Sequence, residues 1–350
     1  MLSKEQLARL ENDGFVVIKN VFNPSCHLDP ILEEMTSILD NLARELHQNG
    51  QIASLYQDRP FGKRLTRIIA ETGQSHSQHF DFSLPKGQVG ATAPMYLGQA
   101  LFRLITNTTL LDCVQDAMGP EIYSNPVQHV RLKPPEAVVP KKVVGMSVLV
   151  GETPWHQDNA VLTQDADATN VLTVWIPLVD ATIENGCLIV IPGSHRDSNL
   201  SAPQKNDNVG NSSITTGDSS SSSTLAQHCP TQGGALRIPD SIIDCYRDTI
   251  VPVPVKRGDI LMFHRRLMHA SLPNMTDDLR SSLDLRYQPL GQPTGRDVFP
   301  GFVVRSSTQK VLESRDEWER LWKETQKRMS SENYKEQPFD RWKADHPMCA

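Results

Sequence analysis

The first third of the chain carries apolar residues at helical spacing. The clearest case runs from 23 to about 47, where one helix face is formed by Leu28, Ile31, Leu32, Met35, Ile38, Leu39 and Leu42. The same criteria predict helices over 3–12, 61–72 and 97–118, the last with a restart at Asn107, and a β-branched strand over 15–18. Ser3 can cap the first helix and Gly14 can end it. These apolar faces indicate core packing.

The pattern changes at about Ile122, after which short β-rich runs alternate with turns that contain Gly and Pro. The runs cover 126–132, 143–150, 171–179, 187–191, 251–255, 259–264 and 281–288. Several short strands at this spacing are typical of an antiparallel sandwich or barrel. The predicted fold is therefore mainly β with flanking helices, in which a helical part over 1–120 packs on the outside of a β core over 122–290.

One polar segment, 198–234, interrupts the β-rich half. Ser, Asn, Gly, Gln and Thr dominate it, and Ser219 to Ser223 is a pure serine run. Such a segment buries too little apolar surface to offset the entropy lost on ordering, so we expect a flexible loop. Both an inert insertion and a lid over an active site remain open. Beyond the core, 310–350 comprises a helix, roughly 315–329, and a tail.

Composition narrows the class of protein. At 350 residues we expect one domain over 1–350, a barrel with added helices, although two domains would fit the same length. A net charge of −6 without a basic block argues against nucleic acid as the main partner. No secretory signal, membrane-spanning apolar run or S-K-L-type peroxisomal ending is visible, so we expect no membrane association and a cytoplasmic location. The oligomeric state is not readable.

The cysteines show no metal-binding or redox spacing. There are six: Cys26, Cys113, Cys187, Cys229, Cys245 and Cys349. The closest two are sixteen residues apart (245 − 229), so no C-x-x-C unit is present. Scattered cysteines in a long chain without a secretory signal are more often reduced, and we expect free thiols here.

Candidate chemistry begins at His156-Gln157-Asp158. In an extended strand, side chains at i and i+2 project to the same side, so an imidazole and a carboxylate would lie together. His269, far downstream, is the candidate for a third ligand. Two histidines and one carboxylate, with open positions opposite, form the ligand set of non-haem Fe(II) oxygenases. The tripeptide alone also occurs at ordinary surfaces, so the hypothesis depends on the rest of the chain.

Arg280 supplies the next element of that hypothesis. It opens a strand eleven residues after His269 (280 − 269), with a turn over 273–278 between them. We predict a hairpin that places His269 and Arg280 on adjacent strands facing one interior. 2-Oxoglutarate can chelate iron through its keto oxygen and adjacent carboxylate, and its distal carboxylate then needs a fixed cation. A guanidinium meets a carboxylate bidentately and stays charged.

Several motifs then follow in a fixed order: His156-x-Asp158, Trp175, the run from Asn185 to His195, the run from Gly258 to His264, His269-x-Ser271 and Arg280. In this order they resemble the phytanoyl-CoA dioxygenase family, which belongs to the Fe(II)- and 2-oxoglutarate-dependent oxygenases. The resemblance covers roughly 12–290 and is strongest over 153–290. It implies a double-stranded β-helix core, also called a jelly-roll or cupin-like core.

The resemblance also implies roles for individual residues. Iron ligands are expected at His156, Asp158 and His269, and the co-substrate carboxylate at Arg280. Ser271 and Trp175 fall where the family lines the 2-oxoglutarate pocket. Lys133-Pro134-Pro135 matches the strand before the H-x-D loop, and that register brings His129 to the same pocket. Halogenating relatives replace the carboxylate ligand with a small residue, so Asp158 favours oxygenation.

Some side chains near these motifs have more than one interpretation. His264 competes with His269 as third ligand, and the His269-x-Ser271 pattern favours His269. His195 can contact substrate or hold its own loop. Ser282 shares a face with Arg280 and can join it in binding a carboxylate. Arg286 lies on that face too and can bind an acidic substrate or be an exposed charge at a sheet edge.

The resulting hypothesis is a dioxygenase that uses Fe(II), 2-oxoglutarate and O2, releases succinate and CO2, and by default hydroxylates an unactivated C–H bond. We expect the substrate to be a small metabolite or natural-product intermediate. The alternatives are 2-hydroxylation of an acyl-CoA, as in the family's name-giving reaction, and desaturation or ring closure at the same site. A further alternative is a non-catalytic cupin-like protein that binds a metal or ligand.

Overall fold

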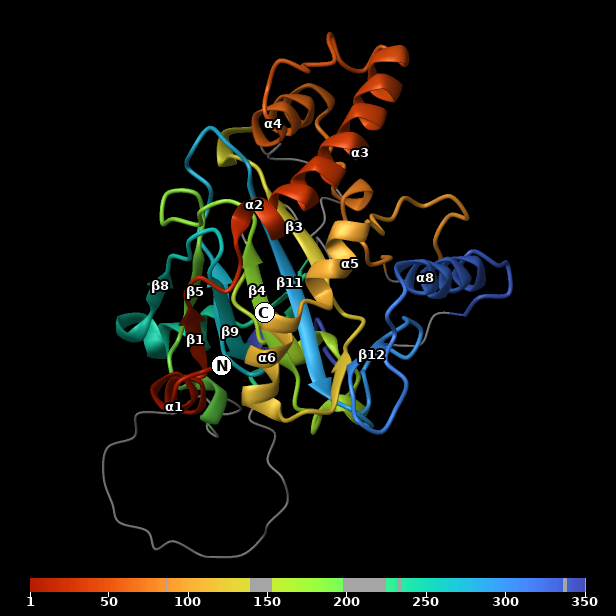
Figure 1. Ribbon diagram of the computed structural model, residues 1–350. Helices are drawn as coiled ribbons and strands as arrows, with labels where there is room; N and C mark the ends of the chain where they lie inside the picture. Colours follow the sequence, from red (N-terminus) through yellow and green to blue (C-terminus); the bar gives the residue numbers. More distant parts are fainter. Residues whose placement is uncertain (86, 139–152, 198–224, 232–234, 336–338, 350) are drawn as a thin grey trace, which may run out of the picture.

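The computed structural model describes residues 1–85, 87–138, 153–197, 225–231, 235–335 and 339–349. The strand predicted over 143–150 and most of the segment over 198–234 lie outside these ranges. Within them, the chain forms a β-rich body with helices on one side and at its periphery (Figure 1).

The body is built from two antiparallel sheets. The larger has seven strands in the order β1-β9-β4-β11-β2-β12, and β3 also pairs with β11. Its strands are β1 Phe15–Ile18, β2 Ile122–Ser124, β3 His129–Lys133, β4 Leu172–Pro177, β9 Ile260–His264, β11 Arg280–Pro289 and β12 Phe302–Arg305. The smaller sheet, in the order β10-β5-β8, contains β5 Leu188–Val190, β8 Val251–Val253 and β10 His269–Ser271. A separate pair joins β6 Cys229–Pro230 to β7 Leu236–Arg237.

The two sheets share a buried apolar cluster. Trp175 on β4 and Phe263 on β9 of the larger sheet pack with Leu188 on β5 and Val253 on β8 of the smaller sheet. Each strand therefore turns one face towards the other sheet, which is the arrangement of a β sandwich or jelly roll. This confirms the prediction of a mainly β fold with a jelly-roll core.

Helices cover the outer face of the larger sheet. The α-helices are α1 Lys4–Asp13, α2 Pro24–His27, α3 Asp29–Gln48, α4 Phe61–Thr72, α5 Gln99–Ile105, α6 Thr108–Met118, α7 Asp240–Ile243 and α8 Arg315–Met329. Short 3-10 turns span Ser77–His79, Glu136–Val138, Asp158–Val161, Gln164–Ala166, Ser194–Arg196, Asp244–Thr249 and Pro347–Cys349. In Figure 1, α5 and α6 lie in front of β11, and one continuous core contains Leu283 of β11 with Leu101 of α5 and Leu110 of α6.

Local sequence explains the ends of several elements. Ser3 and Gln6 form a reciprocal capping box at the start of α1, and Gly14, with φ of 81°, ends the helix. The helix predicted over 23–47 is divided in two. Asn23 caps the four-residue helix α2, and α3 restarts after Leu28 with proline in its first turn. The segment predicted over 97–118 restarts at Asn107 as expected, because the Asn107 side chain caps α6.

The predicted hairpin between His269 and Arg280 is wrong. β10 pairs with β5 in the smaller sheet, whereas β11 pairs with β4, β3 and β2 in the larger one. The connecting residues therefore cross from one sheet to the other. Asn274 holds that crossing, because its side-chain amide donates to the carbonyl oxygens of Lys133 at 3.0 Å and Asp278 at 2.7 Å. Strand spacing alone did not distinguish a hairpin from a corner between sheets.

The expectation of free thiols is wrong for two of the six cysteines. Cys229 and Cys349 form a disulfide across a sequence separation of 120 residues. Leu225 to Thr231 also belong to the folded body, so the polar loop predicted over 198–234 extends too far at this end. The disulfide has no local signal, because Cys349 lies in the C-terminal tail, 120 positions from Cys229.

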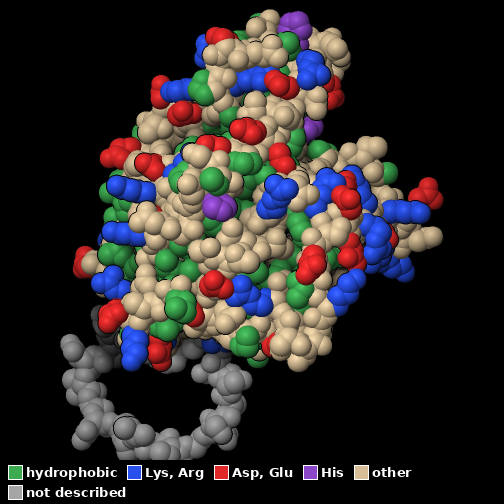
Figure 2. Space-filling model, in the orientation of Figure 1, with side chains coloured by type: hydrophobic (Ala, Val, Ile, Leu, Met, Phe, Trp, Pro, Cys, Tyr) green, Lys and Arg blue, Asp and Glu red, His purple; other side chains and the backbone are tan. Residues whose placement is uncertain are grey.

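The described helices and one face of the surface bear on the expectations about partners. No helix in the described ranges is both long and apolar enough to cross a bilayer. On the face shown in Figure 2, Lys and Arg side chains alternate with Asp and Glu. That face therefore offers no continuous basic surface of the kind that binds nucleic acid.

Candidate active site

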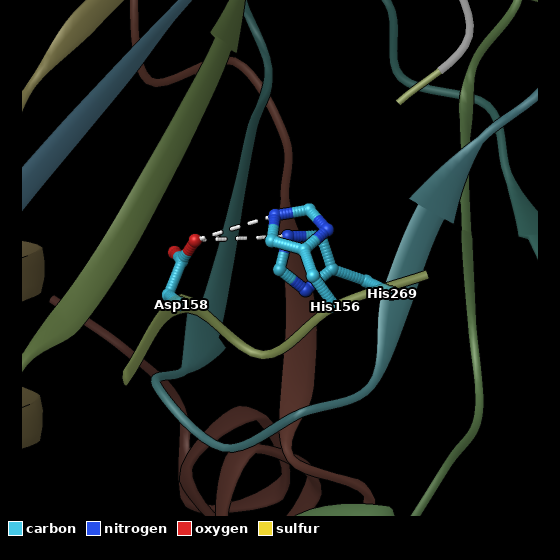
Figure 3. Close-up of side chains that lie close together, drawn as sticks. All are labelled: His156, Asp158 and His269. Carbon is cyan, nitrogen blue, oxygen red and sulfur yellow. Dashed lines mark ion pairs between the residues drawn. The ribbon is translucent and has the colours of Figure 1, made fainter. Parts of the chain in front are cut away.

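Three side chains meet between the two sheets. His156 and His269 form an isolated antiparallel bridge in which the backbone N–H of each donates to the carbonyl oxygen of the other, at 2.9 and 3.0 Å. Asp158 begins the 3-10 turn Asp158–Val161, so the prediction that one extended strand carries both His156 and Asp158 is wrong in detail. The side chains still converge, because Gln157 between them is extended. Asp158 Oδ1 lies 3.7 Å from His156 Nε2 and 3.9 Å from His269 Nε2 (Figure 3).

Backbone carbonyls orient both imidazoles. His156 Nδ1 lies 2.8 Å from the carbonyl oxygen of Pro154, and His269 Nδ1 lies 3.0 Å from that of Leu267. A carbonyl oxygen only accepts, so each Nδ1 carries the proton and each Nε2 presents its lone pair. One atom from each of the three residues lies within 4.8 Å of the others, which suits a single divalent ion.

Asp158 is held from the side opposite the histidines. Arg286 donates from Nη2 to Oδ1 at 2.6 Å and from Nε to Oδ2 at 3.2 Å, and Thr173 Oγ1 also donates to Oδ2. Burial disfavours the ionised carboxylate, but the charge of Arg286, and then the neighbouring His156, outweigh it. The pKa of Asp158 therefore lies well below its usual value. Arg286 is neither exposed nor directed at an acidic substrate, because it is buried and paired with Asp158.

His269 is kept neutral. Burial lowers the pKa of His269 to about 4, and the neighbouring His156 acts in the same direction. A neutral imidazole and an ionised carboxylate are the forms that ligate a metal, so these environments prepare the site for a cation.

A second layer fixes the loop that carries His156 and Asp158. The backbone N–H of Gln157 donates to His228 Nε2 at 3.0 Å, and His228 Nδ1 in turn donates to the carbonyl oxygen of Ala226 at 2.8 Å. The Gln157 side chain accepts from the Ala226 N–H and donates to the carbonyl oxygen of Arg266. His228 contacts this loop from a distant part of the chain. It is a fully buried support of the site, and no sequence signal connects it with a residue 71 positions away.

A narrow pocket leads from the three side chains to Arg280. Its volume is about 20 Å³, and Trp175, Leu188 and Phe263 line it with Arg280. The Arg280 guanidinium lies over the Trp175 ring, 5.4 Å from its centroid, and Nη1 donates to Ser282 Oγ at 2.7 Å. Burial lowers the pKa of Arg280 to about 10, so it remains a cation at neutral pH.

Arg280 has unused hydrogen-bonding capacity. Its Nε is buried without a hydrogen-bond partner among the described residues, and no described carboxylate forms an ion pair with it. The two nearby arginines do have carboxylate partners: Arg131 pairs with Asp284 at 2.7 Å, and Arg286 pairs with Asp158. An unpaired buried donor on a cation is the kind of exception that a bound anion explains.

Two other predicted pocket residues lie elsewhere. Ser271 is fully buried, and its Oγ accepts from Lys133 Nζ at 2.8 Å and from the Thr153 N–H at 3.0 Å. It therefore supports the wall rather than lining the narrow pocket. His129 does not line that pocket either. Its side chain lines a larger cavity that also reaches His156 and Asp158, and its Nδ1 lies 2.8 Å from Asp81 Oδ2.

That larger cavity has a volume of about 420 Å³ and reaches both His156 and Asp158. Its apolar walls come from distant segments: Leu84, Val127, Val161, Leu236 and Phe299. The two spaces share Arg131, Thr153, His156 and Asp158, so they adjoin at the ligand set. A cavity of this size suits a small organic molecule.

The competing histidines lie outside the ligand set. His264 Nδ1 accepts from the Arg266 N–H at 3.1 Å, and burial lowers the pKa of His264 to about 3. His195 Nε2 donates to the carbonyl oxygen of Glu11 at 3.0 Å, which joins its loop to α1. Among the described residues, the group able to hold a metal is His156, Asp158 and His269.

Comparison with known proteins agrees with this geometry. The family model for phytanoyl-CoA dioxygenase (PhyH) matches residues 10–282. The chain belongs to the phytanoyl-CoA dioxygenase family. All the residues of the ligand set and Arg280 fall within the matched range, whereas β12 and α8 lie beyond it.

Individual relatives are distant. The phytanoyl-CoA dioxygenase domain-containing protein 1 of Bos taurus is 24% identical over 292 residues, covering 80% of this chain and 88% of the relative. Its Caenorhabditis elegans homolog is 22% identical over 279 residues, covering 78% and 86%. Among solved structures, the non-heme monooxygenase ThoJ superposes with a TM-score of 0.55 at 19% identity, covering 93% of this chain and 97% of ThoJ. That superposition supports the fold.

Membership in the family identifies Fe(II) and 2-oxoglutarate as the cofactor and co-substrate. The residues fit both groups. His156, Asp158 and His269 provide one carboxylate and two imidazoles with lone pairs directed at one point, and Arg280 provides an unpaired cation in a pocket that adjoins them.

Proposed function

We propose that the protein is a dioxygenase that oxidises, by default hydroxylates, an unactivated C–H bond of a small-molecule metabolite or natural-product intermediate. The observation that carries the proposal is the buried Nε of Arg280, which lacks a partner in the described structure at the end of a pocket that begins at the ligand set. A metal site alone would fit a structural or storage role. A metal site joined to a buried unpaired cation fits a bidentate ligand with a distal carboxylate.

The chain's own residues would prepare and enclose the reaction. Bound at these residues, Fe(II) would supply the activation of O2 and 2-oxoglutarate would supply two electrons, with succinate and CO2 as its products; of the two oxygen atoms, one would end in succinate and the other in the substrate. His156, Asp158 and His269 would hold the ion and leave the opposite positions open. Arg280 and Trp175 would fix the distal end of the co-substrate. The sheets on either side limit access of bulk water.

The size and lining of the larger cavity favour a small substrate over an acyl-CoA. It holds about 420 Å³ and its walls are mostly apolar. Arg131 and Arg296 also line it, but each is engaged within the protein, Arg131 with Asp284 and Arg296 with the carbonyl oxygen of Val161. A coenzyme A nucleotide needs a cluster of cations for its phosphates, and we find no such cluster among the described lining residues. Acyl-CoA 2-hydroxylation and desaturation or ring closure are the alternatives at this site.

An anaerobic titration tests the proposal. Fe(II)-loaded protein is titrated with 2-oxoglutarate while the weak visible metal-to-ligand charge-transfer band is recorded, for wild type, Arg280→Ala and Arg280→Lys. The band should appear with wild type. Arg280→Ala should need at least about tenfold more 2-oxoglutarate, because a charge-assisted bidentate contact is lost, and Arg280→Lys should lie between the two.

A surface arginine provides the control. Arg305 pairs with Asp112 on the outside of the molecule, so Arg305→Ala should titrate like wild type. The absence of the band from iron-loaded wild type would refute the dioxygenase proposal and favour a non-catalytic cupin-like binding protein. If wild type and Arg280→Ala needed the same 2-oxoglutarate concentration for the band, Arg280 would not be the residue that binds the co-substrate.

A further inference from the structure

The larger cavity contains a buried carboxylate joined to a histidine. Asp81 is 1% exposed, and its Oδ2 lies 2.8 Å from His129 Nδ1. His129 projects from the start of β3 and lines the cavity together with His156 and Asp158. Neither residue belongs to the metal ligands or to the narrow pocket.

The hydrogen bonds of Asp81 determine which nitrogen of His129 carries the proton. Asp81 Oδ1 already accepts from the backbone N–H of Val130 at 3.0 Å and from that of Ser83 at 3.5 Å. Oδ2 is left to accept from His129 Nδ1, so Nδ1 holds the proton. In the neutral ring Nε2 is then the acceptor.

His129 Nε2 is available to a molecule in the cavity. Among the described residues, the only partner that His129 has for its side chain is Asp81, through Nδ1. Ser83 also lines the cavity, is 1% exposed, and has a buried Oγ without a hydrogen-bond partner. A buried polar group without a partner inside a cavity wall is an exception that a bound ligand explains. The polar corner of Asp81, Ser83 and His129 is therefore set in otherwise largely apolar walls.

We propose that His129, oriented by Asp81, is the residue that binds a hydroxyl or N–H donor of the substrate and so positions the substrate beside the ligand set. This inference rests on the proposed function, because it names the substrate class of that site: a largely apolar small molecule that carries a hydrogen-bond donor. Since Nε2 accepts, an analogue with a ketone in place of the hydroxyl is rejected, because two acceptors then face each other.

The first experiment determines the tautomer. Long-range 1H–15N correlation spectra of Zn(II)-loaded protein distinguish a protonated from an unprotonated ring nitrogen, and the His129→Gln variant assigns the His129 signals. We expect Nδ1 to be protonated and Nε2 unprotonated in wild type. Protonation at Nε2 instead would overturn the proposal.

The second experiment reverses the preference of His129 Nε2 for a hydrogen-bond donor over an acceptor on the bound molecule. In Asp81→Asn, the amide oxygen is kept at the Oδ1 position by the N–H groups of Val130 and Ser83, so the NH2 group faces His129 Nδ1. His129 must then accept at Nδ1 and donate from Nε2. The probes are menthol, an apolar alcohol, and menthone, the ketone of nearly the same shape. Titrations followed by the His129 signals should show wild type binding menthol at least about tenfold more tightly than menthone, and Asp81→Asn reversing that order.

His129→Phe keeps the ring and removes both nitrogens. Because this variant lacks the His129 signals, its titrations are followed by the backbone amide signals of Ser83 and Leu84, which line the cavity. It should weaken menthol about tenfold and leave menthone within about threefold of wild type, because the ketone gains nothing from Nε2. Equal binding of the two probes by wild type, an unchanged order in Asp81→Asn, or no response of His129 to either probe would each overturn the proposal. These measurements need neither iron nor turnover. Failure here with an intact charge-transfer band refutes only the substrate inference, whereas a missing band refutes the dioxygenase proposal.

Discussion

The narrow pocket and the larger cavity meet at the same three ligands but are built differently. Arg280 and Trp175 of the narrow pocket stand on β11 and β4, two paired strands whose register places Trp175 opposite Asp284. The larger cavity is lined by pieces of at least five segments, most of them loops or strand ends, around 78–85, 127–131, 160–161, 235–236 and 296–299. Regular strands therefore form the proposed co-substrate side, and loops form most of the proposed substrate side. This division lets one chemistry be kept while the substrate changes.

The largest expected effect comes from substituting a residue of the ligand set, where the two spaces adjoin. His269→Ala removes a ligand without leaving a buried charge unpaired. Loss of a residue that only orients a ligand costs 10–100-fold in metal affinity, so loss of the ligand itself should cost more than about 100-fold. Co(II) titration followed by visible absorption measures it. The control is His264→Ala, which removes a partly buried histidine from the preceding strand and should keep wild-type affinity. Equal Co(II) affinity in both variants would contradict the assignment of His269.

The next largest effect comes from breaking the ion pair between Arg286 and Asp158. Arg286→Met leaves the buried carboxylate without its cation and should lower the free energy of unfolding of the metal-free protein by about 3 kcal/mol. A bound divalent ion supplies a replacement charge, so the loss should be smaller for Co(II)-loaded protein. Denaturant titrations of both forms measure the difference.

The matched control is Arg305→Met, which breaks the surface pair with Asp112 and should cost less than about 1 kcal/mol. An equal loss for Arg286→Met with and without metal would show that the ion does not bind at Asp158. The pair also explains why Arg286 was misjudged from sequence. Its face on the strand was correct, but its partner lies 128 positions earlier and no periodicity reveals that.

Sequence reasoning succeeded where strand regularity and motif order coincide. The strand over 15–18 and the helices over 61–72 and 315–329 have the predicted bounds, because capping residues and apolar spacing are local signals. The ligand set and Arg280 were recognised in the same way, and the structure brings them together around adjoining spaces. Their roles as ligands stay predictions that the titrations test.

Sequence reasoning failed where contacts join distant segments. His129 was expected beside the co-substrate, yet its strand carries it into the larger cavity, and Asp81, its partner, lies in a loop without a motif. The hairpin between His269 and Arg280 was wrong because ten residues suffice to cross between sheets. The disulfide between Cys229 and Cys349 depends on a tail that folds back over 120 residues.

That disulfide provides a test confined to the larger cavity. It anchors β6, and β6 pairs with β7, where Leu236 lines the cavity. Cys349→Ser should lower the free energy of unfolding by about 2 kcal/mol, because closure of a long loop restricts the unfolded chain. It should also weaken menthol binding while leaving the 2-oxoglutarate titration unchanged.

Cys245→Ser, which removes an exposed free cysteine, is the matched control and should change none of these quantities. Denatured, unreduced wild type should show four reactive thiols, since two of its six cysteines are bonded. Six reactive thiols would mean that the bond does not form. A changed 2-oxoglutarate titration in Cys349→Ser would show that the two spaces are not independent.

The smallest expected effect is confined to the narrow pocket. Trp175→Phe keeps an aromatic face under Arg280 but a weaker one, because indole attracts a cation more strongly than benzene does. A desolvated contact of this kind contributes on the order of 1 kcal/mol, so the half-saturating 2-oxoglutarate concentration should rise about fivefold. Menthol binding should not change, because Trp175 does not line the larger cavity.

Phe299→Leu is the reciprocal variant. Of the two spaces, Phe299 lines only the larger cavity, so menthol binding should weaken and 2-oxoglutarate binding should not. If either variant altered both titrations equally, the separation of a strand-built co-substrate pocket from a loop-built substrate cavity would be wrong.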